Sequence, residues 1–97
     1  MSLLSTATKM GVTTSALQDL INGHVPLSIA AQLGVTASSL QQFIDGSASV
    51  STGRLFSVTS SGAQDLRNQV GKNGAIGLII GLCIGRNEAG GTDEPAA

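Results

Sequence analysis

Apolar residues recur at helical spacing in the first half of the chain. Within residues 26–46 they lie three or four positions apart, as on one face of a helix (Ile29, Leu33, Leu40, Phe43 and Ile44). Serine and glutamine occupy the positions on either side of Leu40 (Ser38, Ser39, Gln41 and Gln42), which is typical of the solvent-facing side of a helix. The pattern predicts two short helices joined by a tight turn at Gly34.

This pattern returns along the chain at a regular interval. Segments 3–23 and 26–46 share 11 identical residues in 21 positions. A further shift of the same size reaches residues 57–69, which keep seven residues of the first copy (Val58, Thr59, Ser61, Gln64, Asp65, Leu66 and Asn68). Because self-similarity marks repeated supersecondary units, we expect three helical hairpins, the third of them degraded. Residues 1–70 are therefore predicted to form an all-α domain, a small bundle of short helices from tandem 23-residue helix-turn-helix-like repeats.

Small polar residues and glycines at equivalent places predict the helix ends. A hydroxyl accepts the free amide hydrogens at a helix start, so each first helix is expected to begin at a serine and each second helix at a threonine (Ser5 and Ser28; Thr13, Thr36 and Thr59). Glycine suits the left-handed residue that ends a helix, which places helix ends at four glycines (Gly11, Gly34, Gly23 and Gly46).

The second copy resembles the helix-turn-helix of phage repressors, the lambda-repressor-like family. Residues 29–36 look like its second helix and turn, and residues 37–45 fall where its recognition helix lies. The spacing between Gly34 and Gly46, which end these helices, also fits. With residues 13–22 as the first helix and the segment from Val50 as the fourth, the resemblance covers residues 13–58. A LysM domain over residues 26–58, with a closing strand at Gly53-Arg54-Leu55, is a competing resemblance.

The repressor resemblance implies a face that reads bases in the major groove. By position this face holds Ser38, Ser39, Gln41 and Gln42, with Arg54 placed for a backbone contact, and Gln pairs bidentately with adenine. Duplex affinity also needs Lys and Arg on phosphates, yet none of the five cations lies within residues 37–45. With a pI of about 5.5, the chain favours a protein partner over duplex DNA.

An uncharged apolar segment, 74–85, lies between Lys72 and Arg86. As a helix it would be about 18 Å long, shorter than the roughly 30 Å hydrocarbon core of a bilayer, so no transmembrane span is predicted. Its glycines recur every three or four residues and would line one helix face, as in a glycine zipper (Gly74, Gly77, Gly81 and Gly85). Residues 71–86 are thus predicted to be a C-terminal glycine-rich apolar helix.

Three interpretations of this segment stay open. The glycine face could join subunits, or the helix could complete the core of the hairpins, or Ile76–Ile84 could pair as a strand between subunits. After it, residues 87–97 have no apolar periodicity and are expected to form a flexible acidic tail.

The composition and the reactive residues argue against catalysis. The chain is 41% hydrophobic, 11% charged and 2% aromatic, which predicts a folded protein with an aliphatic core. His24 lies in a linker and Cys83 in the apolar segment, and one His with one Cys cannot form a structural zinc site. We expect no enzyme, no metal or other cofactor and no small-molecule substrate. The beginning of the sequence has neither a basic region nor an apolar run, so a cytoplasmic location is expected.

Two classes of function follow. In the first, a non-enzymatic structural or interaction protein self-associates through the glycine-lined segment and presents its hairpin to a protein partner. In the second, a small dimeric transcriptional regulator of the phage-repressor type binds DNA sequence-specifically, and the apolar segment is the interface that matches two half-sites. Both classes predict a homo-oligomer, and the shortage of cations favours the first.

Overall fold

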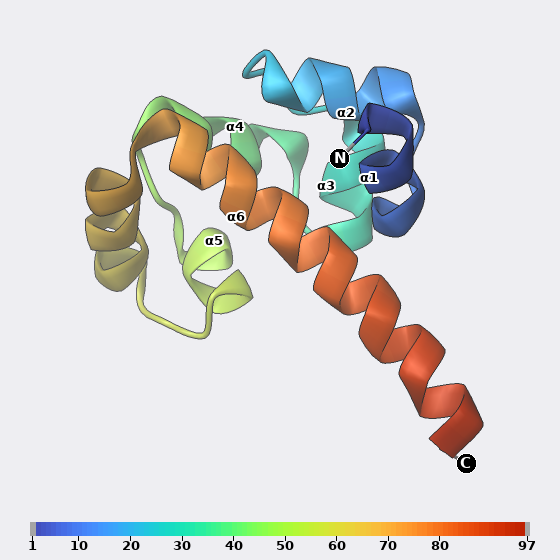
Figure 1. Ribbon diagram of the computed structural model, residues 1–97. Coiled ribbons are helices and arrows are strands. Elements are labelled where there is room, and N and C mark those ends of the chain that lie inside the picture. The colour runs from blue at the N-terminus through green and yellow to red at the C-terminus, as the bar shows by residue number, and fades with distance from the viewer. Residues whose placement is uncertain (1, 97) are drawn as a thin grey trace.

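Within residues 2–96 the computed structural model has six helices, and side chains are described for residues 2–87 (Figure 1). The helices are α1 (Leu3–Met10), α2 (Thr14–Ile21), α3 (Leu27–Leu33), α4 (Ala37–Asp45), α5 (Val50–Leu55) and α6 (Ser60–Ala96). The backbone of α6 breaks at Gly71, whose φ of 75° and ψ of −176° only glycine adopts readily. The all-α prediction is confirmed, since the described backbone contains no strand.

The sequence repeat is confirmed as three helical hairpins: α1 with α2, α3 with α4, and α5 with the part of α6 before Gly71. In each hairpin the turn places one residue in the left-handed region, with φ between 59° and 76° (Gly11, Gly34 and Ser57). The next amide N–H donates to a carbonyl five residues earlier, at 2.9–3.1 Å (Val12 to Ala7, Val35 to Ala30, Val58 to Gly53). The third copy is therefore a full structural repeat although its sequence is degraded.

The predicted caps are correct for the second helix of each hairpin and wrong for the first. Thr13, Thr36 and Thr59 each accept an amide hydrogen three residues on, at 3.0–3.1 Å. Helix α1, however, begins one turn earlier than expected, with Ser2 as its cap and Ser5 as the donor of the amide hydrogen. Helix α3 begins at Leu27, so Ser28 lies inside its first turn. The residue before this helix is Pro26, which makes no side-chain cap bond.

Both alternatives that placed a strand in the chain are wrong. The segment Gly53-Arg54-Leu55, taken as the closing strand of a LysM domain, is the second half of helix α5, because Ser49 caps that helix by accepting from the Thr52 amide. Ile76–Ile84 lies within α6, where its backbone hydrogen bonds are made along the helix.

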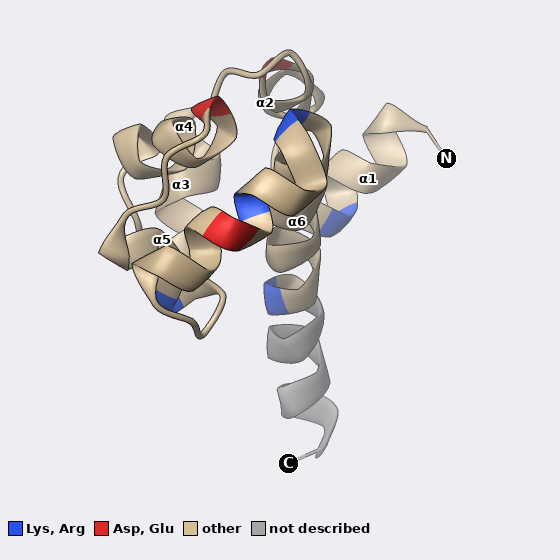
Figure 2. Ribbon diagram, turned by 90° about the vertical axis from the view of Figure 1, so that its left-hand side faces the viewer, with Lys and Arg blue, Asp and Glu red and all other residues tan. Residues whose placement is uncertain are grey.

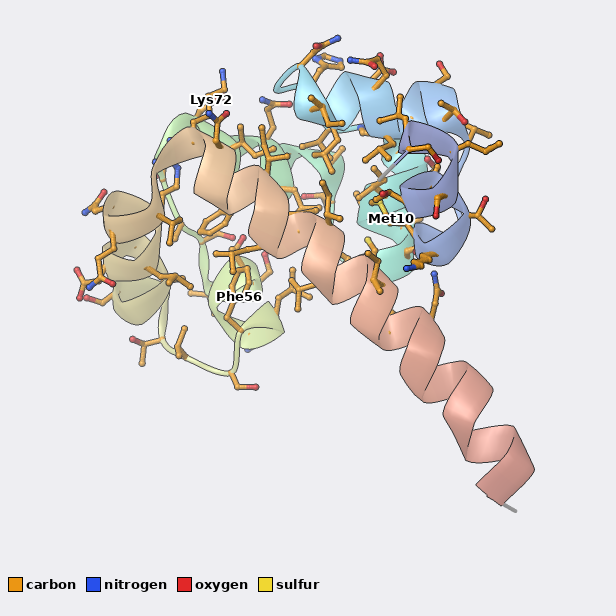
Figure 3. The ribbon with its side chains drawn as sticks, in the orientation of Figure 1. Met10, Phe56 and Lys72 are labelled. Atoms are coloured by element: carbon orange, nitrogen blue, oxygen red, sulfur yellow. The ribbon has the colours of Figure 1, made fainter. Side chains whose placement is uncertain are left out.

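Helix α6 after Gly71 is the centre of the fold. It crosses the molecule from upper left to lower right in Figure 1, and α6 contacts each of the other five helices. Met10 of α1 and Phe56 at the end of α5 lie on opposite sides of it in Figure 3. Phe56 also stacks at a tilt on Phe43, with 5.3 Å between ring centroids. The hairpins therefore bury their inner faces around one shared helix.

The inner face of this segment completes the core, as one of the three interpretations predicted. Ala75, Ile76, Ile79 and Cys83 are buried among the aliphatic side chains of the hairpins. Among the described residues, none of the helices combines the length and the apolar character needed to cross a bilayer. The tail predicted over residues 87–97 lies, apart from Asn87, outside the residues whose side chains are described.

Candidate functional site

The first candidate surface is the outward face of α6. Gly77, Gly81 and Gly85 are exposed, and a Cβ built on any of them would find nothing within 4 Å. Gly74 differs from these three, because a Cβ there would come within 2.5 Å of the Val70 Cβ. The predicted row of four glycines is thus an open face of three, with Gly74 needed for the close approach at the kink.

Large aliphatic side chains border these three glycines on both sides. Four of them are half-buried, touching the core with one part and leaving another exposed (Leu78, Ile80, Leu82 and Ile84). No polar side chain occurs between Gly74 and Gly85, while the exposed Lys72 and Arg86 lie beyond the two ends. We call Gly77, Gly81 and Gly85 with these four neighbours the glycine face; it is a shallow apolar strip about two and a half helical turns long.

The second candidate surface is the outward face of α4. Ser38 and Gln42 are exposed, as the helix-turn-helix resemblance requires, and Arg54 is exposed on α5. Asp45, on the same side of α4 by helical spacing, is exposed as well. This face therefore offers two neutral polar side chains and one carboxylate.

Ser39 and Gln41 were predicted to belong to this face, and the structure corrects both. Ser39 is half-buried, and its Oγ accepts from the Thr36 hydroxyl at 3.0 Å and from the Ser51 hydroxyl at 3.2 Å. The Gln41 Nε2 donates to the Gly23 carbonyl at 2.8 Å, and its Oε1 accepts from the Val25 amide at 2.9 Å. Gln41 thus holds the linker between the first two hairpins and is not free for a partner.

The same contact recurs one repeat later. The Gln64 Nε2 donates to the Gly46 carbonyl at 2.6 Å, and its Oε1 accepts from the Ala48 amide at 2.9 Å. Each of these partners lies one full repeat beyond the corresponding partner of Gln41. We call this pair of hydrogen bonds the glutamine clasp; in it the second helix of one hairpin binds the linker that leaves the preceding hairpin.

Sequence reasoning missed a set of exposed apolar residues at one repeat position. Leu4, Leu27 and Val50 are 66%, 78% and 59% exposed and occupy equivalent positions of the three repeats. The signal was present, since Leu4 and Leu27 are identical in the repeat alignment and lie off the apolar stripe of their helices. Each hairpin therefore presents a large apolar side chain to solvent at the start of its first helix.

The charges do not gather on either surface. Figure 2 shows the blue segments of Lys and Arg spread over α1, α5 and α6, with none on α3 or α4. The half-buried Arg67 is already used, because its guanidinium donates to the Phe43 carbonyl at 2.7 Å and to the Ile44 carbonyl at 2.6 Å. The α4 surface thus lacks the basic footprint typical of duplex binding.

The reactive side chains lie apart from one another. Cys83 is buried, and this burial raises the pKa of its thiol, with Arg86 acting in the opposite direction. His24 is exposed in the first linker. The described residues contain no cluster of metal-ligating side chains and no pocket.

Nothing matches this chain in comparisons with protein-family models, with curated proteins and with solved structures. The lambda-repressor-like resemblance of residues 13–58 therefore stays a prediction. Function has to be inferred from the surfaces that this chain presents.

Proposed function

We propose that the protein is a non-enzymatic interaction protein that pairs with a second copy of itself through the glycine face and presents its hairpins to a protein partner. One observation carries the proposal: a helix at the centre of the fold keeps an entirely apolar outward strip exposed, with open space above three of its glycines. Exposed contiguous apolar surface on a small protein marks an interaction site.

The shape of the strip fits a copy of itself. The exposed glycines form a groove along the helix, and the i, i+4 pairs Leu78/Leu82 and Ile80/Ile84 form a ridge on each side. Ridges of one helix pack into the grooves of another at a defined crossing angle, and small residues let the two backbones approach closely. Two crossed helices diverge on both sides of the crossing point. Lys72 and Arg86 of one chain therefore stay apart from Lys72 and Arg86 of the second copy. The pairing is isologous, because the same face is used on both chains.

A protein partner suits the remaining outer surface better than a polyanion. The exposed α4 side chains are Ser38, Gln42 and Asp45, and the hairpins add large apolar side chains at one repeat position. A carboxylate repels phosphate, whereas apolar anchors within a polar surround are what protein interfaces use.

Two substitutions of Gly81 are expected to change association and folding in opposite ways. Gly81→Ala should raise the free energy of unfolding of the monomer by about 0.5–1 kcal/mol, because glycine is a poor helix former and the new Cβ meets nothing. It should also weaken self-association, because the same Cβ separates the paired backbones. Gly81→Leu should weaken association about tenfold or more. Sedimentation equilibrium measures association, and denaturant unfolding of the dilute protein measures stability.

Ser61→Leu is the matched control for Gly81→Leu, since it adds the same side chain at an exposed position of α6 before the kink. It should leave the dimer unchanged. Unchanged association of Gly81→Leu, with its fold intact, would remove the glycine face as the interface.

A second candidate function is sequence-specific DNA binding. Ser38 and Gln42 do project from the second helix of a hairpin whose turn is left-handed at Gly34, which favours this alternative. If it holds, the protein should select a palindromic site from a random duplex pool, with binding that weakens as salt rises. Gln42→Ala should then relax base preference at one position by about 1–3 kcal/mol. Absence of binding at low salt rejects this function.

A further inference from the structure

The first hairpin also has a glutamine at the position of the glutamine clasp, but no hairpin precedes it in the described chain. Gln18 occupies the repeat position that Gln41 and Gln64 occupy in the second and third hairpins. Its side chain is exposed, and within residues 2–87 it makes one hydrogen bond, to Asn22 Oδ1 at 3.4 Å. Gln41 and Gln64 make the corresponding bond to Asp45 and Asn68 in addition to their clasps. The amide of Gln18 is therefore oriented as in the other hairpins but binds no linker.

A second residue of the same face is exposed in the first hairpin only. Ile44 is fully buried, whereas its equivalent Ile21 is 44% exposed. Arg67 occupies this position in the third hairpin, where it donates to the last carbonyls of α4. This contact shows that the position faces the end of the preceding second helix. Gln18 and Ile21 thus mark one docking face, formed like those of the later hairpins and left open.

We propose that Gln18 and Ile21 bind the end of the third hairpin of a second copy of this chain. The contacts between hairpins show what this face accepts: the C-terminal carbonyls of a second helix and the backbone of the linker after it. The third hairpin offers such an end at residues 67–71, because the break at Gly71 takes the last carbonyls of the preceding turn out of the intrahelical pattern.

This contact joins two different surfaces, so it is heterologous and differs from pairing through the glycine face. In Figure 1, α2 runs along the top of the molecule and the first part of α6 forms its left edge. The third hairpin ends close to the linker that follows α2, because the side chain of Lys72, just after the break at Gly71, approaches Gly23. Heterologous contacts that do not close into a ring propagate, as the stacked units of repeat proteins do.

Sedimentation velocity of the full chain over a range of concentrations separates this contact from the glycine face. Gly81→Leu should still associate with rising concentration, because its hairpin ends are intact. Adding Gln18→Ala and Ile21→Ser should weaken that residual association tenfold or more, while adding Gln42→Ala, another exposed glutamine, should not. A Gly81→Leu protein that stays monomeric at every concentration would overturn the proposal, and so would residual association that ignores the Gln18 and Ile21 changes.

Cross-linking tests the direction of the contact. In a Cys83→Ala background, Asn22→Cys places an exposed thiol next to Ile21, and Val70→Cys places one at the end of the third hairpin. Under mild oxidation, an equal mixture of the two variants should form covalent dimers at least several-fold faster than either variant alone. Equal rates in the mixture and in the separate variants, or no covalent dimer in the mixture, would contradict a head-to-tail contact.

Discussion

Ile79→Ala is expected to lower the free energy of unfolding by about 2–5 kcal/mol. Ile79 is fully buried on the segment of α6 around which the three hairpins pack, so the deletion leaves a cavity where several helices meet. Helices α1 to α5 have only six to nine residues each, too short to be stable without that shared contact. Urea denaturation followed by circular dichroism measures the loss as a lower midpoint with an unchanged slope.

Ile80→Ala is the matched control, because it removes the same atoms one residue further along the helix. Ile80 is half-buried at the border of the glycine face, so the loss of stability should be clearly smaller. Equal losses for the two variants would show that α6 is not the centre of the core.

The hairpin geometry could be predicted from the sequence because short-range chemistry fixes it. A threonine at the cap and a glycine in the left-handed region determine the turn of the first two hairpins without help from distant residues. In the third hairpin Ser57 takes the left-handed position with a φ of 59°. No sequence rule predicts serine there; the turn is closed by local backbone bonds, from the Ser57 amide to the Arg54 carbonyl at 3.1 Å and from the Val58 amide to the Gly53 carbonyl at 2.9 Å.

The helix starts and the surface of α4 were less predictable, since they depend on neighbours. Ser5 and Ser28 have the chemistry of caps, yet Ser2 caps α1 and Pro26 precedes α3. Helical spacing placed Gln41 on the outer side of α4. Spacing along one helix does not show that a linker from the preceding hairpin passes within reach of its amide.

The interpretations of the apolar segment were not exclusive. The sequence left core completion and self-association open because every residue from Gly74 to Gly85 is apolar. In the structure the inward side of this helix carries Ile79 and Cys83, and the outward side carries the exposed glycines. Core completion is confirmed by burial, and self-association is the proposal that substitutions in the glycine face test.

The glutamine clasp explains how hairpins with few charged residues are held together: each later hairpin binds the linker that follows the hairpin before it. Linker carbonyls and amides that face another hairpin must be paired, since an unmet polar group away from water costs free energy. A side-chain amide has both a donor and an acceptor, so one glutamine meets both needs at once. Neither serine nor leucine at this position could bind Gly23 and Val25 together.

Gln41→Ala is therefore expected to lower the free energy of unfolding by about 1–3 kcal/mol, since it leaves the half-buried Gly23 carbonyl and the Val25 amide without their partner. Gln42→Ala, one residue further on and exposed, should change stability by less than about 0.5 kcal/mol. Gln64→Ala should repeat the loss, because its bonds to Gly46 and Ala48 are equivalent. Thermal and urea unfolding of the three variants measure the difference. If Gln41→Ala were as stable as Gln42→Ala, the linker would be held by packing alone. The exposed Gln18 would then no longer indicate a docking face.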